Sequence, residues 1–292
     1  MNLSLKTIAC FAGITLLSPL NAWAGPQIFS GSGADATTAF DAFRVAINGG
    51  SRINWDGVAV DGTDANPETR IIDTGKTVEI PVDRFRGRGA IFEDPYAVSA
   101  DGFGSVNPES AGQFPAFTPN NTFVMFDPEN GSFSDQVIEQ TFVLPNTDIA
   151  AGTRGFGAIF VDTELAGATR IEFRGVNING HEVDLGSFDV PVGGNGETQF
   201  LGVLFDAPVI TEVELVVGTH ALFSFDGTNV ASFGAERLQD GIDLVVTDDF
   251  VFATPELATA VPEPSTVALM LAGLAPLLRR KIRQANRCLL AD

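Results

Sequence analysis

Cysteine is scarce in this chain of 292 residues. Its two cysteines, Cys10 and Cys288, lie close to the two ends of the sequence. Residues 25–264, the body of the protein, therefore contain no thiol, which excludes a disulfide framework and a metal site built from cysteine. A segment of this length can fold around a hydrophobic core without such crosslinks. A metal bound by the body would need oxygen ligands.

Aromatic residues with a polar group are almost as scarce. The chain has one tyrosine and two tryptophans, but 24 phenylalanines. Tyrosine and tryptophan are typical of sugar-binding surfaces and protein interfaces, because their polar tips tolerate water. Phenylalanine lacks such a tip and is usually buried. We therefore expect the aromatic side chains to form a core, and this bias disfavours a carbohydrate-binding platform.

Positively charged residues are also scarce. The body contains 11 lysines and arginines against 36 aspartates and glutamates, which gives it a net charge of −25. A surface of this sign repels the phosphates of nucleic acids and anionic lipids. We therefore expect no nucleic-acid partner. The same charge suits solubility outside the cell or the binding of divalent cations.

The first 24 residues have the pattern of a secretory signal peptide. Lys6 precedes a mostly apolar run over residues 7–20, and Ala22-Trp23-Ala24 supplies small residues before Gly25. This order of charge, apolar run and small residues is the one that signal peptidase recognises. The run is too short to cross a bilayer, which takes about 20 residues. We expect cleavage after Ala24.

An apolar segment followed by positive charge ends the chain. Residues 267–278 are apolar and contain Pro276, and as a helix they would reach only about 18 Å. The hydrocarbon core of a bilayer is about 30 Å thick, so this segment is a marginal span. Residues 279–292 form a basic tail that would stop translocation on the cytoplasmic side. Its first three residues are Arg279, Arg280 and Lys281. Such a tail suits a transient membrane intermediate that is later cut.

A proline-containing linker, residues 254–266, joins the body to this tail. It carries Val261-Pro262-Glu263-Pro264. This motif, the apolar segment and the basic cluster, in this order, resemble the PEP-CTERM sorting domain. The resemblance implies that an exosortase, a membrane transpeptidase, recognises the Pro-Glu-Pro motif and removes the tail. It also implies a Gram-negative host that makes exopolysaccharide, and a route from the inner membrane to the cell envelope or extracellular matrix.

The body has the pattern of a mainly β protein. Phe40, Phe43 and Ile47 have helical spacing and predict one short helix over residues 35–47, after a loop over residues 25–34. Short apolar or alternating runs predict strands, and Asn179-Gly180 predicts a hairpin turn between residues 176–178 and 181–183. The runs are residues 52–55, 77–80, 90–93, 122–126, 137–144, 155–162, 169–175, 187–192, 199–205, 211–217, 221–225 and 243–253. We therefore expect an antiparallel, jelly-roll-like β-sandwich over residues 25–253, with additional helices in the signal peptide and the apolar tail.

The body also resembles a recurrent ectodomain of PEP-CTERM proteins. The similar stretches are "AFDAFRVAINGG", "RINWDGV", "FRGRGAIF", "RGFGAIFVDTE" and "DGIDLVVTDDFVF". The resemblance implies an aromatic-rich β-sandwich that ends in an Asp-Asp-Phe strand. It carries over no established biochemical activity.

The sequence offers little for catalysis. His181 and His220 are the two histidines, and neither belongs to a Gly-x-Ser-x-Gly or His-Glu-x-x-His motif. Paired carboxylates could cleave glycosides, but so acidic a chain always offers such pairs. We expect no enzymatic activity.

Arg84, Arg86 and Arg88 form the basic cluster of the body. In an extended segment, this spacing would place all three side chains on one face. They could bind the carboxylates of an acidic polysaccharide. The alternative, ion pairs with the protein's own carboxylates, is the one that we favour.

Asp248 and Asp249 lie in the last predicted strand. Successive side chains of a strand face opposite sides, so we expect one to face inward and the other to face solvent. With Asp56 in the turn after an earlier strand, they could hold a structural calcium. Residues 61–68 form a second acidic loop without the order of an EF-hand.

The sequence is compatible with three kinds of function. We favour a non-enzymatic cell-envelope or matrix protein associated with exopolysaccharide or biofilm, whose partners are signal peptidase, exosortase and, transiently, the membrane. The alternative is a carbohydrate-binding module with a calcium-stabilised jelly roll. A hydrolase is the third.

Overall fold

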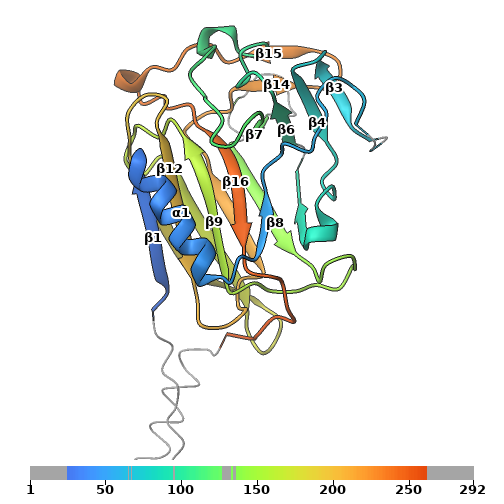
Figure 1. Cartoon of the computed structure of the whole chain (residues 1–292), viewed down its shortest axis with the longest axis vertical. Coiled ribbons are helices and arrows are strands. Elements are labelled where there is room, and N and C mark those ends of the chain that lie inside the picture. Colours follow the sequence, from blue (N-terminus) through green and yellow to red (C-terminus); the bar gives the residue numbers. More distant parts are fainter. Residues whose placement is uncertain are drawn as a thin grey trace, which may run out of the picture.

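The computed structural model describes residues 25–64, 66, 68–94, 96–126, 133 and 136–261 (Figure 1). The segments predicted to be the signal peptide, residues 1–24, and the sorting tail, residues 262–292, lie outside the described residues. The site residues predicted there are Ala24, Pro262, Glu263, Pro264, Arg279, Arg280 and Lys281.

Two antiparallel sheets form a β-sandwich, as predicted. The larger sheet has the order β1 (Gln27–Ser32), β12 (Thr198–Leu204), β9 (Gly155–Val161), β16 (Val246–Phe252), β7 (Thr122–Met125), β6 (Tyr96–Ser99), β4 (Thr77–Ile80) and β3 (Arg70–Asp73). A further strand, β2 (Ser51–Ile53), also pairs with β16. The smaller sheet has the order β11 (Glu182–Asp189), β10 (Arg170–Val176), β13 (Glu212–Val216), β8 (Val137–Phe142) and β5 (Ala90–Phe92). A separate hairpin joins β14 (Phe223–Phe225) to β15 (Val230–Ser232).

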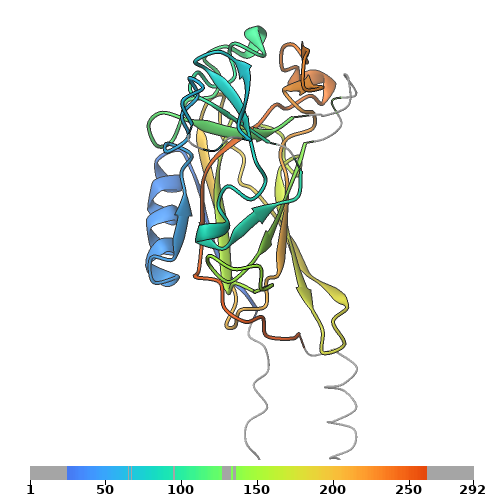
Figure 2. The same ribbon diagram turned by 90° about the vertical axis from the view of Figure 1, so that its right-hand side faces the viewer.

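The predicted helix is α1 (Ala34–Ala46), the one α-helix among the described residues. It lies on the outer face of the larger sheet, so that helix, larger sheet and smaller sheet form successive layers (Figure 2). Phe40 and Phe43 of α1 pack against Phe200 of β12, with ring centroids 5.5 and 5.7 Å apart. Gly202 and its partner Gly157 leave room for these rings, because a Cβ at Gly202 would come within 2.8 Å of Phe43.

A cluster of aromatic rings fills the space between the two sheets. Trp55 is stacked on Phe123, with ring centroids 3.9 Å apart, and Phe92, Tyr96 and Phe250 surround the pair. All five side chains are buried. The prediction that the aromatic residues form a core is confirmed for these residues.

The structure contains strands that were not predicted, β3, β6 and β15, and it differs from the prediction in other places as well. Residues 25–34 were expected to form a loop, but they contain β1, which pairs with β12 along its whole length. The hairpin turn at Asn179-Gly180 is confirmed, with Gly180 at a φ of 76°. The second strand of this hairpin was expected over residues 181–183, and a separate strand over residues 187–192, but the structure has one strand, β11 (Glu182–Asp189). The errors at β1 and β11 arise from glycines and serines, which weaken the β signal although the backbone pairs normally.

The chain after β16 remains on the sandwich. Glu256 exchanges two backbone hydrogen bonds with Gly152, and the N–H of Val261 donates to Val176 O at 2.8 Å. Residues 254–261 were expected to be a tether, but they are docked because this backbone finds partners on the body. Val261 is partly buried and packs against the core between the sheets. The described chain therefore begins and ends at the same end of the sandwich (Figure 1).

Three short 3₁₀ helices connect strands on the surface. They are η1 (Arg86–Arg88), η2 (Pro108–Ser110) and η3 (Leu238–Asp240). In the described part of the chain, no helix combines the length and the apolar character that a membrane crossing requires.

Candidate functional site

Asp248 and Asp249 lie at a β-bulge in β16. The register of β16 against β9 shifts between Asp248 and Phe250, so Asp249 is an extra residue on this strand. Both aspartates are buried, with 0% of either residue exposed. The expectation that one would face solvent is wrong for two physical reasons. The bulge interrupts the alternation of side chains, and both faces of the larger sheet are covered.

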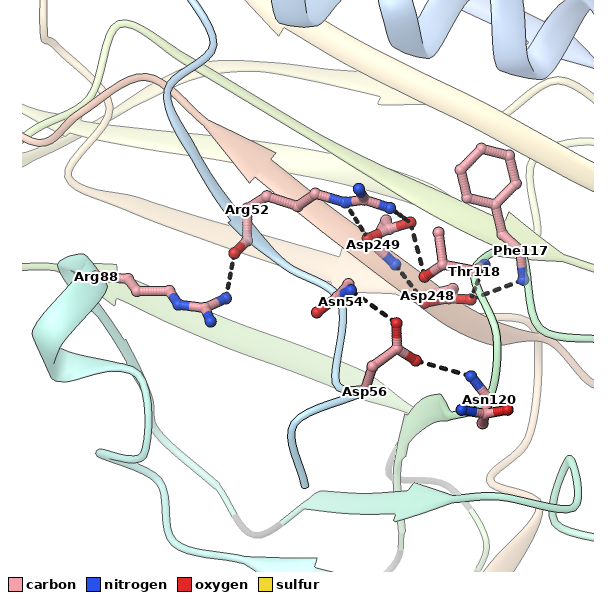
Figure 3. Close-up of polar contacts among 9 residues, drawn as sticks. All are labelled: Arg52, Asn54, Asp56, Arg88, Phe117, Thr118, Asn120, Asp248 and Asp249. Carbon is pink, nitrogen blue, oxygen red and sulfur yellow. Dashed lines mark hydrogen bonds and ion pairs between the residues drawn. The ribbon is translucent and has the colours of Figure 1, made fainter. Parts of the chain in front are cut away.

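Asp249 is bound by Arg52 of β2 (Figure 3). Arg52 Nε donates to Oδ1 and Nη2 donates to Oδ2, both at 2.6 Å. The Arg52 guanidinium also lies over the ring of Phe40 in α1, 5.4 Å from its centroid. The hydrogen bond to Asp249 is the main cause of the raised pKa of Arg52. Burial raises the pKa of Asp249, and this two-point ion pair opposes the shift.

Asp248 has no cation of its own among the described residues. Its carboxylate accepts hydrogen bonds from the N–H groups of Phe117, Thr118 and Asp249, at 2.7, 3.2 and 2.8 Å. Burial, and then the charge of Asp249, raise the pKa of Asp248 to about 8, although these N–H groups oppose the shift. Among the described residues, Arg52 is the cation that pairs with this group of two aspartates.

Asp56 lies in the turn after β2. It accepts hydrogen bonds from Asn54 Nδ2 at 2.7 Å and from Asn120 N at 2.8 Å (Figure 3). Among the described residues, Asp56, Asp248 and Asp249 do not form a group in which one oxygen of each lies within 4.8 Å of the others. Calcium binding by these residues stays a prediction, and in the structure the counterion of Asp249 is Arg52.

A different acidic cluster was not predicted from the sequence. Asp162, Glu164 and Glu236 each place a carboxylate oxygen within 4.8 Å of the others. Burial raises the pKa of Asp162 to about 6 and that of Glu236 to about 8. These oxygen atoms are of the type that binds calcium. The sequence signal that could have found part of it is Asp162-Thr163-Glu164 directly after a buried strand, but its partner Glu236 lies far away in the chain.

The arginine cluster is not extended, because Arg86 and Arg88 belong to η1. Arg84 makes a two-point contact with Asp64 in the second acidic loop, with distances of 2.5 and 2.7 Å. Arg86 pairs with Asp148. The condition for a common face, an extended segment, is therefore not met, because residues of a helical turn point in different directions. The interpretation as internal ion pairs is confirmed for Arg84 and Arg86.

The two histidines have ordinary surroundings. His220 shares a hydrogen bond of 3.0 Å with the Thr219 hydroxyl and packs against Phe233. Burial lowers the pKa of His220. His181 is exposed beside the β10–β11 turn. Neither histidine makes a hydrogen bond or ion pair with a carboxylate of the described residues, which is the contact that would orient a catalytic base.

Comparisons of the chain with protein-family models, with curated proteins and with solved structures gave no match.

Proposed function

We propose that this protein is a non-enzymatic component of the bacterial cell envelope or extracellular matrix, exported by its N-terminal segment and sorted by its C-terminal segment. The observation that carries the proposal is the order of three elements at the end of the sequence. These are Pro262-Glu263-Pro264, the apolar residues 267–278 and the basic residues 279–292. This order fits a tail that is held at the membrane and then cut.

The fold is compatible with this role. Residue 262 directly follows Val261, which is hydrogen-bonded to the body. Because the described chain begins and ends at one end of the sandwich, an anchored protein would present the opposite end, with the β14–β15 hairpin, away from the membrane (Figure 1). A body held together by its core, without cysteine, folds equally well in an oxidising compartment.

The proposed route has three steps. Signal peptidase cuts after Ala24, the apolar segment holds an inner-membrane intermediate, and an exosortase cuts at the Pro-Glu-Pro motif of a Gram-negative host. The released body then becomes associated with exopolysaccharide in the envelope or biofilm.

The test is mass spectrometry of the mature protein from its host. We expect an N-terminus at Gly25 and no peptide from Arg280 onward. The variant Glu263→Ala should keep the intact tail in the membrane fraction. The matched control is Glu256→Ala, which changes an exposed glutamate outside the motif and should be processed normally. An intact C-terminus in envelope material of the wild type would contradict the proposal.

A further inference from the structure

A small cavity lies between the turn after β2 and the segment around η1. Its volume is about 270 Å³. One wall is formed by Asn54, Trp55, Gly57 and Val58, and the other by Arg84, Phe85, Gly87 and Arg88. The side chains that matter for its chemistry are Asn54, Trp55, Arg84, Phe85 and Arg88.

The charge of this cavity is opposite to that of the protein. Two arginines line it and no acidic residue does, although the body has a net charge of −25. The charge of Arg84 is balanced by Asp64. Arg88, by contrast, has no carboxylate within 4.0 Å among the described residues. Arg88 is exposed, so the cavity contains a solvated cation whose counterion the described chain does not supply.

The position of Arg88 is fixed although its charge is not paired. Its Nη1 donates to the backbone oxygen of Arg52 (Figure 3). Its guanidinium lies over the ring of Phe85, 5.5 Å from the centroid. The other guanidinium N–H groups make no hydrogen bond to the described residues, so they can bind an acceptor without losing an existing contact. A cation held in this way is preorganised for a ligand.

Trp55 provides the second, independent observation. It is 1% exposed, and its indole Nε1–H is buried without a hydrogen-bond partner in the described residues. A buried indole N–H normally has a partner, because an unmade hydrogen bond is costly. Trp55 also adopts a φ of 60°, a conformation that is strained for a bulky side chain. Such strain is concentrated at functional sites.

These groups define the chemistry of a ligand. Guanidinium and indole N–H groups are donors, and the amide nitrogen of Asn54 is already bound to Asp56. A carboxylate accepts at two oxygen atoms and matches the planar arginine fork. Phe85 adds a small apolar edge, because 8% of this residue is exposed. The volume is small for a ligand pocket, which usually has about 300–1,000 Å³.

We propose that this cavity binds a uronate, a single sugar acid, through its carboxylate group. Arg88 donates to the carboxylate, and the sugar ring occupies the rest of the cavity beside Asn54 and Phe85. This proposal goes beyond sorting and does not depend on it, so either can fail alone.

Isothermal titration calorimetry of the full chain in mild detergent tests the proposal. The probes are sodium glucuronate, glucose, sodium acetate and inorganic phosphate. We expect glucuronate to bind, acetate and phosphate to bind at least about tenfold more weakly, and glucose to give no heat. Arg88→Gln should weaken glucuronate binding by about tenfold or more, because a charge-assisted hydrogen bond is lost. The matched control is Arg86→Gln, which removes a charge two residues away that is paired with Asp148 and does not line the cavity.

A second readout locates the binding. The indole N–H signal of Trp55 in a nitrogen-15 correlation spectrum should shift on saturation with glucuronate, and this shift should disappear in Arg88→Gln. Equal binding of glucose and glucuronate, or equal binding of acetate, would overturn the proposal. So would an equal loss of affinity in Arg86→Gln, an unshifted Trp55 signal, or no binding at all.

Discussion

Arg52 and Asp249 form a two-point ion pair that joins β2 to β16 across 197 residues of sequence. Both nitrogen–oxygen distances are 2.6 Å. The side chain of Asp249 is fully buried, and that of Arg52 is 30% exposed. Because the carboxylate is buried, it depends on this arginine as its counterion, and Thr118 Oγ1 donates a further hydrogen bond to its Oδ2 at 3.2 Å.

Removing Arg52 should therefore destabilise the protein strongly. We expect Arg52→Met to lower the free energy of unfolding by about 3–5 kcal/mol, because it leaves a buried carboxylate without a counterion. Urea denaturation measures this change. Arg237→Met is the control, since its pair with Asp240 is exposed and should contribute at most about 1 kcal/mol. The double variant Arg52→Met with Asp249→Asn should recover part of the loss. A cost below about 1 kcal/mol for Arg52→Met would show that the pair does not stabilise the fold.

The buried carboxyl of Asp248 should make stability depend on pH. Its pKa rises from 3.8 to about 8 on folding, so the folded state binds one proton more than the unfolded state between these values. Its contribution to stability is complete below about pH 4 and is lost as the pH rises through about 8. The slope is about −1.4 kcal/mol per pH unit for one proton. Asp248→Asn removes this titrating group. The free energy of unfolding of the variant should therefore fall less steeply than that of the wild type as the pH rises. Urea denaturation at several pH values from 5 to 8 measures both slopes. Parallel curves for the two proteins would contradict the assignment.

The contact between α1 and the larger sheet depends on the absence of a side chain at Gly202. Gly202→Ala places a Cβ 2.8 Å from rings of Phe43 and Phe200. Overpacking of this kind costs about 1–3 kcal/mol, which should be seen as a lower melting temperature. Gly194→Ala is the matched control, because its Cβ would meet only the Glu197 side chain, at 3.6 Å or more. An unchanged melting temperature for Gly202→Ala would mean that α1 can move away from the sheet without cost.

Calcium should stabilise the protein more than magnesium does. A ligand at about 100 times its Kd adds about 2.7 kcal/mol, which corresponds to several degrees in melting temperature. Magnesium requires a tighter octahedral site and should do less. Thermal unfolding in EDTA, calcium and magnesium measures the difference. Loss of the calcium effect in Asp249→Asn would assign it to the predicted site, and loss in Glu236→Gln would assign it to the cluster with Asp162. Equal small shifts in melting temperature with both ions would contradict a specific calcium site in this protein.

The sequence predicted those parts of the fold that depend on periodicity. The helix and the central strands have clear hydrophobic patterns, and their positions agree with the structure to within a few residues. β1 was missed because "QIFSGS" contains residues that disfavour strands, and only its pairing with β12 makes it one. The surroundings of Asp249 could not be predicted either. The bulge depends on pairing with β9, and Arg52 comes from a strand at the other end of the sequence.

The chemistry of the cavity beside Trp55 could not be predicted from the sequence either. In the sequence, Arg84, Arg86 and Arg88 form one group. In the structure, Arg84 and Arg86 have different ion-pair partners, and Arg88 has none among the described residues. Which arginine lacks a partner depends on where Asp64 and Asp148 lie in space, and a sequence does not contain this information directly.

The docked segment after β16 has a mechanical consequence. A pulling force applied to the chain beyond Val261 would first load the Val261–Val176 hydrogen bond, then the bond from Thr259 N to Pro208 O, and then the two bonds between Glu256 and Gly152. These contacts would yield one after another, lengthening the chain and absorbing work before any force reached β16, whose pairing with β9 holds the middle of the larger sheet. In a protein tethered at that end, residues 254–261 would thus detach and extend under load before the larger sheet is pulled apart.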